Sequence, residues 1–104
     1  MKPDFKKAAQ ILDMAFSSKH QILGLVASDC RIFFYQSKDH KFHLVPLLVI
    51  DASELSMQTA IWYMEAHGVW LTSGKDNVLR EWTLNSQILN RKETERDSYL
   101  NKEL

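Results

Sequence analysis

The chain contains an internal repeat with a period of 47 residues. Shifting the sequence by that distance aligns AFSSKHQILGLVASDCRIFFYQ with WYMEAHGVWLTSGKDNVLREWT without a gap. Phe16 then aligns with Tyr63, and Asp29 aligns with Asp76. A period of this length corresponds to one supersecondary unit, so we expect two copies of one small structural unit.

Each copy consists of short apolar runs separated by turn residues, which is typical of an antiparallel β-meander. In ILDMAF, for example, Leu12, Met14 and Phe16 alternate with Asp13 and Ala15, as in a strand with two different faces. The predicted strands are 11–16, 22–27, 31–36 and 42–50 in the first copy, and 59–63, 69–73, 78–83 and 87–91 in the second. The sequence therefore predicts an all-β fold of two four-stranded antiparallel sheets.

The repeat also predicts the organisation of the chain. We expect an N-terminal extension at 1–10, a first unit at 11–57, a second unit at 58–91 and a charged tail at 92–104. The last residues, RKETERDSYLNKEL, show no β alternation and mix both signs of charge. The tail is therefore expected to be a frayed terminus or a short solvated helix.

Composition excludes several classes of partner. Thirteen Lys and Arg residues balance thirteen Asp and Glu residues, so neither nucleic acid nor an anionic membrane is an expected partner. A single cysteine, Cys30, cannot form an internal disulfide or a Cys-rich zinc site. The longest apolar run, 45–50, is too short to span a bilayer, and no secretory signal follows Met1. The expected compartment is the cytoplasm.

The segment VWLTSGKDNVLREWTL resembles the WD-repeat family, whose members fold as β-propellers. The matching residues are Thr72, Ser73, Gly74, Asp76, Leu79, Arg80 and Trp82, and the upstream copy matches at Asp29, Ile32 and Tyr35. The resemblance implies that each unit is one propeller blade. Because propellers close with typically 4 to 8 blades, two blades form only an incomplete propeller.

The sequence departs from the family pattern at several positions. The Gly-His pair that precedes the innermost strand in the family is missing from both copies, and Gln36 and Thr83 replace the aspartate of the Trp-Asp pair. Glu81 stands where the family places an apolar residue against the neighbouring blade, and Phe34 occupies that position in the first copy. The two units are therefore divergent blades.

A structural turn network is expected between the second and third strands of each unit. An aspartate in this tight turn can accept hydrogen bonds from turn amides and from a Ser or Thr hydroxyl, while the third-strand aromatic packs beneath it. The residues assigned to this network are Asp29, Tyr35, Thr72, Asp76 and Trp82.

The resemblance implies an interaction scaffold that binds a protein or peptide through its loops. Possible partner-binding residues are Ser28, Lys75, Asp51, Glu54, Trp62 and Trp70. The two tryptophans are of a type that dominates binding energy, but a position in the core between blades is favoured for them over a contact with a partner. Remaining propeller blades or further copies of the chain are expected to cover the open blade faces. We favour a fragment of a longer propeller over a ring of several copies.

Two alternatives stay open: a nonfunctional or regulatory truncated fragment of a larger WD-repeat protein, and a small metal-dependent enzyme. His40 and His43, beside Asp39, suggest a metal site, but this spacing in a strand directs the two rings to opposite faces. Cys30 lies in a predicted turn, and the sequence assigns it neither the general base nor the orienting acid that nucleophilic catalysis requires. No catalytic, cofactor-binding or metal-binding residue is predicted, and the chain is expected not to be an enzyme.

Overall fold

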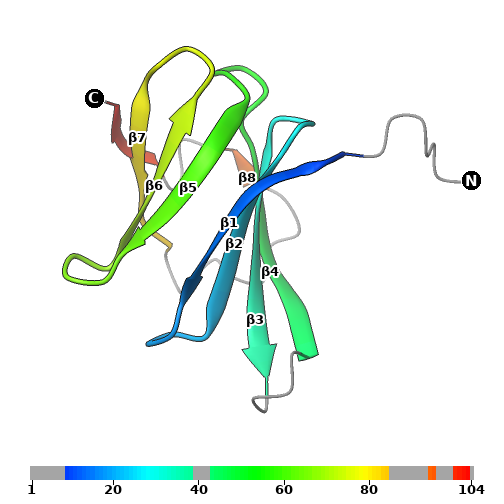
Figure 1. Cartoon of the computed structure of the whole chain (residues 1–104), viewed down its shortest axis with the longest axis vertical. Coiled ribbons are helices and arrows are strands. Elements are labelled where there is room, and N and C mark those ends of the chain that lie inside the picture. The colour runs from blue at the N-terminus through cyan, green and yellow to red at the C-terminus, as the bar shows by residue number, and fades with distance from the viewer. Residues whose placement is uncertain (1–8, 39–42, 85–93, 96–99, 104) are drawn as a thin grey trace, which may run out of the picture.

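The computed structural model describes residues 9–38, 43–84, 94–95 and 100–103, which form two β-sheets (Figure 1). The first sheet has the strand order β1 (Ile11–Ser17), β2 (Ile22–Ala27), β3 (Arg31–Lys38), β4 (His43–Asp51) and β8 (Thr94–Glu95). The second sheet has the order β5 (Gln58–Met64), β6 (Val69–Gly74), β7 (Leu79–Trp82) and β9 (Leu100–Glu103). All neighbours are antiparallel except β4 and β8. The all-β prediction is confirmed.

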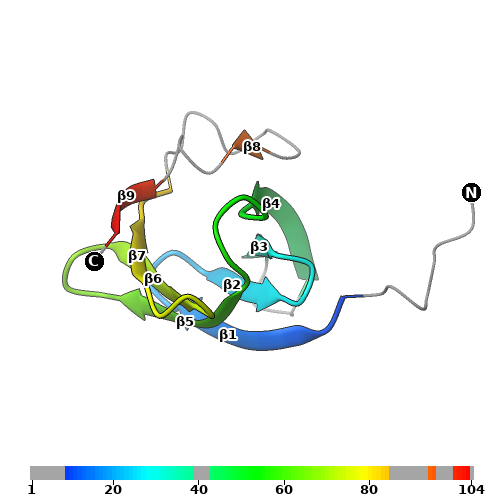
Figure 2. The ribbon, with the colours of Figure 1, turned by 90° about the horizontal axis from the view of Figure 1, so that it is seen from above.

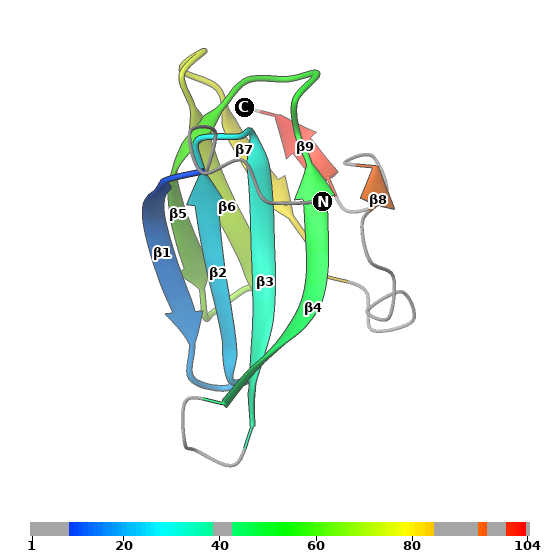
Figure 3. The ribbon, with the colours of Figure 1, turned by 90° about the vertical axis from the view of Figure 1, so that its right-hand side faces the viewer.

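The strands β1 to β7 lie close to their predicted positions, with bounds that differ by at most two residues. Figure 3 shows β1 to β4 side by side in chain order. The predicted eighth strand, 87–91, lies outside the described residues. The fourth strand of the second sheet is instead Leu100–Glu103, which pairs with β7. The expectation of a frayed or helical tail is wrong for these residues, because a strand of four residues, LNKE, is too short to show an alternating pattern in the sequence.

The two sheets diverge from β1 and β5, which lie next to each other, and β8 and β9 are the strands at their far edges (Figure 2). The core fills the space between the sheets. Its buried members come from both sheets, which is why the two sheets pack as one unit: Val26, Ile32, Phe34, Leu48, Ile50, Ile61, Trp70 and Trp82. We call the faces that carry these residues the inner faces of the sheets.

Close packing at the centre of the core depends on Gly24 in β2. A Cβ atom at this position would lie 2.8 Å from Cζ3 of Trp70 and 3.0 Å from Cε1 of Phe34. The missing side chain allows the ring of Trp70 to approach the backbone of the first sheet, and this ring meets that of Phe34 edge to face at 5.1 Å. Gly24 therefore sets how closely the sheets approach each other.

Each sheet also has an outer face, directed away from the other sheet. Paired residues on neighbouring strands share a face, so the outer face of the first sheet carries Met14, Phe16, Leu23, Phe33 and Tyr35. The outer face of the second sheet carries Trp62, Met64, Val69, Leu71, Leu79 and Glu81. Met14 and Phe16 are 58% and 47% exposed, and Trp62 and Met64 are 48% and 37% exposed. Both outer faces thus present large apolar side chains to solvent.

Candidate functional site

The turn between β6 and β7 is organised by Asp76. Its Oδ1 accepts a hydrogen bond from the backbone N–H of Val78 at 3.2 Å, and both carboxylate oxygens accept from the guanidinium of Arg80, at 2.6 and 3.2 Å. The hydrogen bond from Arg80 lowers the pKa of Asp76, and that from Asp76 raises the pKa of Arg80. This carboxylate ties the turn to the third strand of its sheet.

Arg80 itself is buried, with 4% of its side chain exposed, and it is bound on two sides. Its Nε donates a hydrogen bond to Oε2 of Glu103 at 2.6 Å, while its two terminal nitrogens donate to Asp76. Glu103 belongs to β9, so a buried cation connects the turn to the last strand of the sheet. A buried guanidinium needs such partners, because leaving it unpaired would be strongly unfavourable.

A chain of buried hydrogen bonds runs beside this ion pair. The indole Nε1–H of Trp82 donates to Oγ1 of Thr72 at 2.8 Å, and the Thr72 hydroxyl donates to Oε1 of Gln58 at 2.6 Å. The Gln58 amide nitrogen then donates to the carbonyl oxygen of Ser56 at 2.8 Å. The structure thus links Thr72 and Trp82 directly, and it adds Gln58, which sequence reasoning missed.

Gly74 lies between the ion pair of Asp76 with Arg80 and the hydrogen-bonded chain that contains Gln58. A Cβ atom here would lie 2.6 Å from Oδ1 of Asp76, 2.9 Å from Nε2 of Gln58 and 3.1 Å from Nη1 of Arg80. Only glycine leaves room for all three side chains at the end of β6. Its position next to the turn is the signal in the sequence that a crowded polar site lies there.

The equivalent turn of the first sheet is built differently. Asp29 accepts a hydrogen bond from the backbone N–H of Arg31 at 3.2 Å and forms an ion pair with its side chain at 3.4 Å. Tyr35 stacks on Phe33 at 6.5 Å between ring centroids. In the repeat, Ile11 and Leu25 stand where Gln58 and Thr72 stand in the second sheet, and neither has a polar side chain. The structure therefore does not join Asp29 and Tyr35 into one buried chain.

The connection between β4 and β5 holds the two turns together. The backbone N–H of Ala52 donates to the carbonyl of Cys30 in the first turn at 2.9 Å, and that of Lys75 in the second turn donates to the carbonyl of Met57 at 2.9 Å. In addition, the backbone N–H of Asp76 donates to Oγ of Ser56 at 3.2 Å. One end of the two sheets, at the top of Figure 1, is thereby a single hydrogen-bonded surface, which we call the loop end.

Four of the possible partner-binding residues are exposed at the loop end: Ser28, Asp51, Glu54 and Lys75. They come from both turns and from the connection between them. Ser28 is held by the backbone of Gln10, whose N–H donates to Oγ of Ser28 at 2.8 Å. Asp51 accepts from the N–H of Ser53 at 2.9 Å. The loop end therefore presents side chains of both charges from both sheets on a fixed backbone.

The two tryptophans lie elsewhere. Trp62 is exposed on the outer face of the second sheet, where it pairs with Leu71. Trp70 is only 2% exposed and packs against Phe34 and Tyr63 in the core. In this structure Trp70 is thus a core residue and is not available to a partner.

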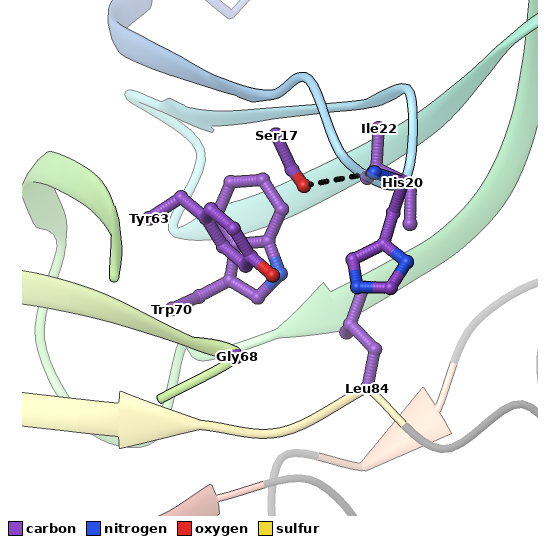
Figure 4. Close-up of a pocket in the computed structure, with 7 residues that line it drawn as sticks. All are labelled: Ser17, His20, Ile22, Tyr63, Gly68, Trp70 and Leu84. Carbon is purple, nitrogen blue, oxygen red and sulfur yellow. Dashed lines mark hydrogen bonds between the residues drawn. The ribbon is translucent and has the colours of Figure 1, made fainter. Parts of the chain in front are cut away.

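A hollow of about 210 Å³ lies at the end of the sheets opposite the loop end (Figure 4). The ring of His20 meets that of Tyr63 edge to face at 6.4 Å, and Oγ of Ser17 accepts a hydrogen bond from the backbone N–H of His20 at 3.2 Å. The remaining lining residues are Ile22, Gly68, Trp70 and Leu84. Its described lining is mostly aromatic and aliphatic, and these residues do not form the convergent polar groups of a catalytic site.

Within the described residues, no three His, Cys, Asp or Glu side chains come together as metal ligands would. His40 and Asp39, considered above as metal ligands, lie outside the described residues. Nor does the described part of the chain contain a helix of the length and apolar character needed to cross a membrane. No model of a known protein family matches this chain, and no curated protein matches it in sequence at a significant level.

Proposed function

We propose that the chain is a pair of divergent WD-repeat blades that acts as a protein-interaction module, binding a protein or peptide at the loop end and catalysing no reaction of its own. The observation that carries this proposal is the connection between β4 and β5, which hydrogen bonds to the turns of both sheets. A surface assembled from two sheets and fixed by backbone hydrogen bonds loses little conformational entropy on binding.

The resemblance to a WD blade is supported by the polar chain of the second sheet. In the family, a histidine precedes the innermost strand of each blade; here Gln58, the first residue of β5, bonds to Thr72, and Thr72 bonds to Trp82. An amide can accept from a hydroxyl and donate to a carbonyl, as Gln58 does. We infer that Gln58 substitutes for the histidine in stabilising this blade.

The side chains at the loop end favour a polypeptide partner with both charged and neutral groups. Asp51, Glu54 and Lys75 provide both signs of charge, and Ser28 provides a hydroxyl. This mixture is typical of the rim of a protein interface and lacks the excess of Lys and Arg that phosphate backbones require. The proposed ligand class is therefore a protein or peptide.

Site-specific photocrosslinking in cells would test the loop end as the binding surface. A photoreactive amino acid at Ser28 or Lys75 should give a discrete crosslinked protein, whereas the same group at Lys19 or Glu65, exposed at the opposite end, should not. The crosslinked protein, once purified, should bind the wild-type chain and lose affinity for Lys75→Glu but not for the control variant Lys19→Glu. Equal crosslinking from both ends, or equal binding by both variants, would contradict the proposal.

A further inference from the structure

The repeat relates each outer face to an inner face of the other sheet. Phe16, Leu23 and Tyr35 of the first outer face align, 47 residues on, with Tyr63, Trp70 and Trp82 of the second inner face. The same shift aligns the second outer face with the first inner face. The aligned pairs are Val69 with Ile22, Leu71 with Gly24, Leu79 with Ile32, and Glu81 with Phe34. The exposed faces therefore carry the equivalents of the two faces that already pack together in this structure.

The sizes of the aligned side chains are complementary as well. In the observed interface, the large Trp70 fits because Gly24 has no side chain and Phe34 flanks it. At the aligned positions of the outer faces, Leu23 replaces the tryptophan, and Leu71 replaces the glycine. At this central contact one side is smaller where the other is larger, so the two outer faces can approach each other there as the inner faces do. Trp62 and Met64 stand where the first inner face carries the smaller Ala15 and Ser17, so the contact between copies is more widely spaced at that edge.

We propose that the outer face of the first sheet binds the outer face of the second sheet of another copy of this chain, head to tail. Large exposed apolar side chains lie on both faces, and burying them together is favourable. The interface is heterologous, since different faces meet, so it continues from copy to copy until a ring closes or the chain of copies ends. This inference rests on the repeat and on the packing of the two sheets, not on ligand binding at the loop end.

One contact of the internal interface would be missing between copies. Asp13 on β1 accepts a hydrogen bond from the N–H of Ile61 on β5, but Ala60 stands at the position equivalent to Asp13 in the second sheet. Glu81 also replaces the apolar Phe34. Both differences make the contact between copies weaker than the contact within the chain, so the association is expected to be reversible and dependent on concentration.

Complementation between two variants tests this inference by sedimentation equilibrium. Phe16→Asp blocks only the first outer face, and Trp62→Asp blocks only the second. Wild-type chain should show an average mass that rises with concentration above the 12.1 kDa of one chain. Each variant alone should stay at that mass, and an equimolar mixture should form a complex of twice that mass and no larger, because one intact face of each kind remains. Lys75→Glu, at the loop end, should associate like the wild type.

Three results would overturn the inference. A monomeric wild-type chain at high micromolar concentration would mean that something other than a second copy covers these faces. Self-association of either variant alone would mean that identical faces meet. A mixture that stays monomeric while the wild type associates would place the interface elsewhere. Near-ultraviolet circular dichroism, which reports on the buried Trp70 and Trp82, verifies that each variant folds. If Phe16→Asp fails this check, Met14→Lys replaces it, and if Trp62→Asp fails, Met64→Lys replaces it.

Discussion

The carboxylate of Asp13 on β1 accepts a hydrogen bond from the backbone N–H of Ile61 on β5 at 3.0 Å. These residues are 48 positions apart and belong to different sheets. The bond satisfies a backbone donor at the edge of one sheet with a side chain from the edge of the other. It therefore joins the two sheets directly, where β1 and β5 lie next to each other.

Replacing Asp13 should weaken this junction. Asp13→Ala is expected to lower the free energy of unfolding by about 1–2 kcal/mol, because the N–H of Ile61 loses its acceptor in a partly buried position. Urea denaturation followed by tryptophan fluorescence measures the loss. Asp13→Asn is the matched control: it keeps one carbonyl oxygen and should lose less. Equal losses for the two variants would show that the hydrogen bond is not the source of the effect.

Removing the hydroxyl of Thr72 should break two hydrogen bonds of the buried polar chain. Thr72→Val keeps the shape of the side chain but leaves the indole N–H of Trp82 and the amide oxygen of Gln58 without their partner. The expected loss in unfolding free energy is about 1–3 kcal/mol. Thr72→Ser, which keeps the hydroxyl, should lose less. A destabilisation by Val no larger than that by Ser would contradict the hydrogen-bonded chain.

Acid should destabilise the fold in part through Asp76. Arg80 lowers the pKa of Asp76 in the folded chain, so the stabilisation from this pair is complete at neutral pH, and it is lost as the pH falls below about 4 and through the lowered pKa. Asp76→Asn should unfold at lower temperature than the wild type at pH 7, and the difference should shrink toward pH 2. Thermal unfolding across this range measures both. A difference that is independent of pH would rule out the ion pair as its cause.

Gly24 should not tolerate even one methyl group. The added Cβ of Gly24→Ala would lie 2.8 Å from the ring of Trp70, and such overpacking is expected to cost about 1–3 kcal/mol. Combining it with Trp70→Leu should give less destabilisation than the sum of the two single changes, since the smaller side chain makes room. Additive losses in urea denaturation would show that the two residues do not compete for the same space.

More of the contacts around the β6–β7 turn than of those around the β2–β3 turn could be predicted from the sequence. Asp76 accepts the expected hydrogen bond from a turn amide, that of Val78, but its side-chain donor is Arg80 and not the expected Ser or Thr hydroxyl. Thr72 donates to Gln58 instead and accepts from Trp82. Asp29 and Tyr35 matched the same spacing but lack the polar neighbours. The aligned residues Ile11 and Leu25 were already visible in the repeat as a sign that the polar chain would be absent there.

Two parts of the site could not be read from local patterns. Gln58 is an amide at the start of a strand, with no periodicity or motif that assigns it a role, and only the fold places it beside Thr72. Glu103 reaches Arg80 from 23 residues away, within a segment that looked like a solvated tail. The contact of Gln58 depends on the exact register of the β5–β6 hairpin. The contact of Glu103 depends on which strands become neighbours, and this is decided by packing over the whole chain.

The hollow beside His20 and Tyr63 lies at one end of the junction between β1 and β5, between the β1–β2 and β5–β6 hairpins and opposite the loop end. His20 belongs to the hairpin of the first sheet and Tyr63 to the second sheet. The edge-to-face contact between their rings therefore reports on how the two sheets pack at this end. The imidazole of His20 is thus a natural nuclear magnetic resonance probe of that packing.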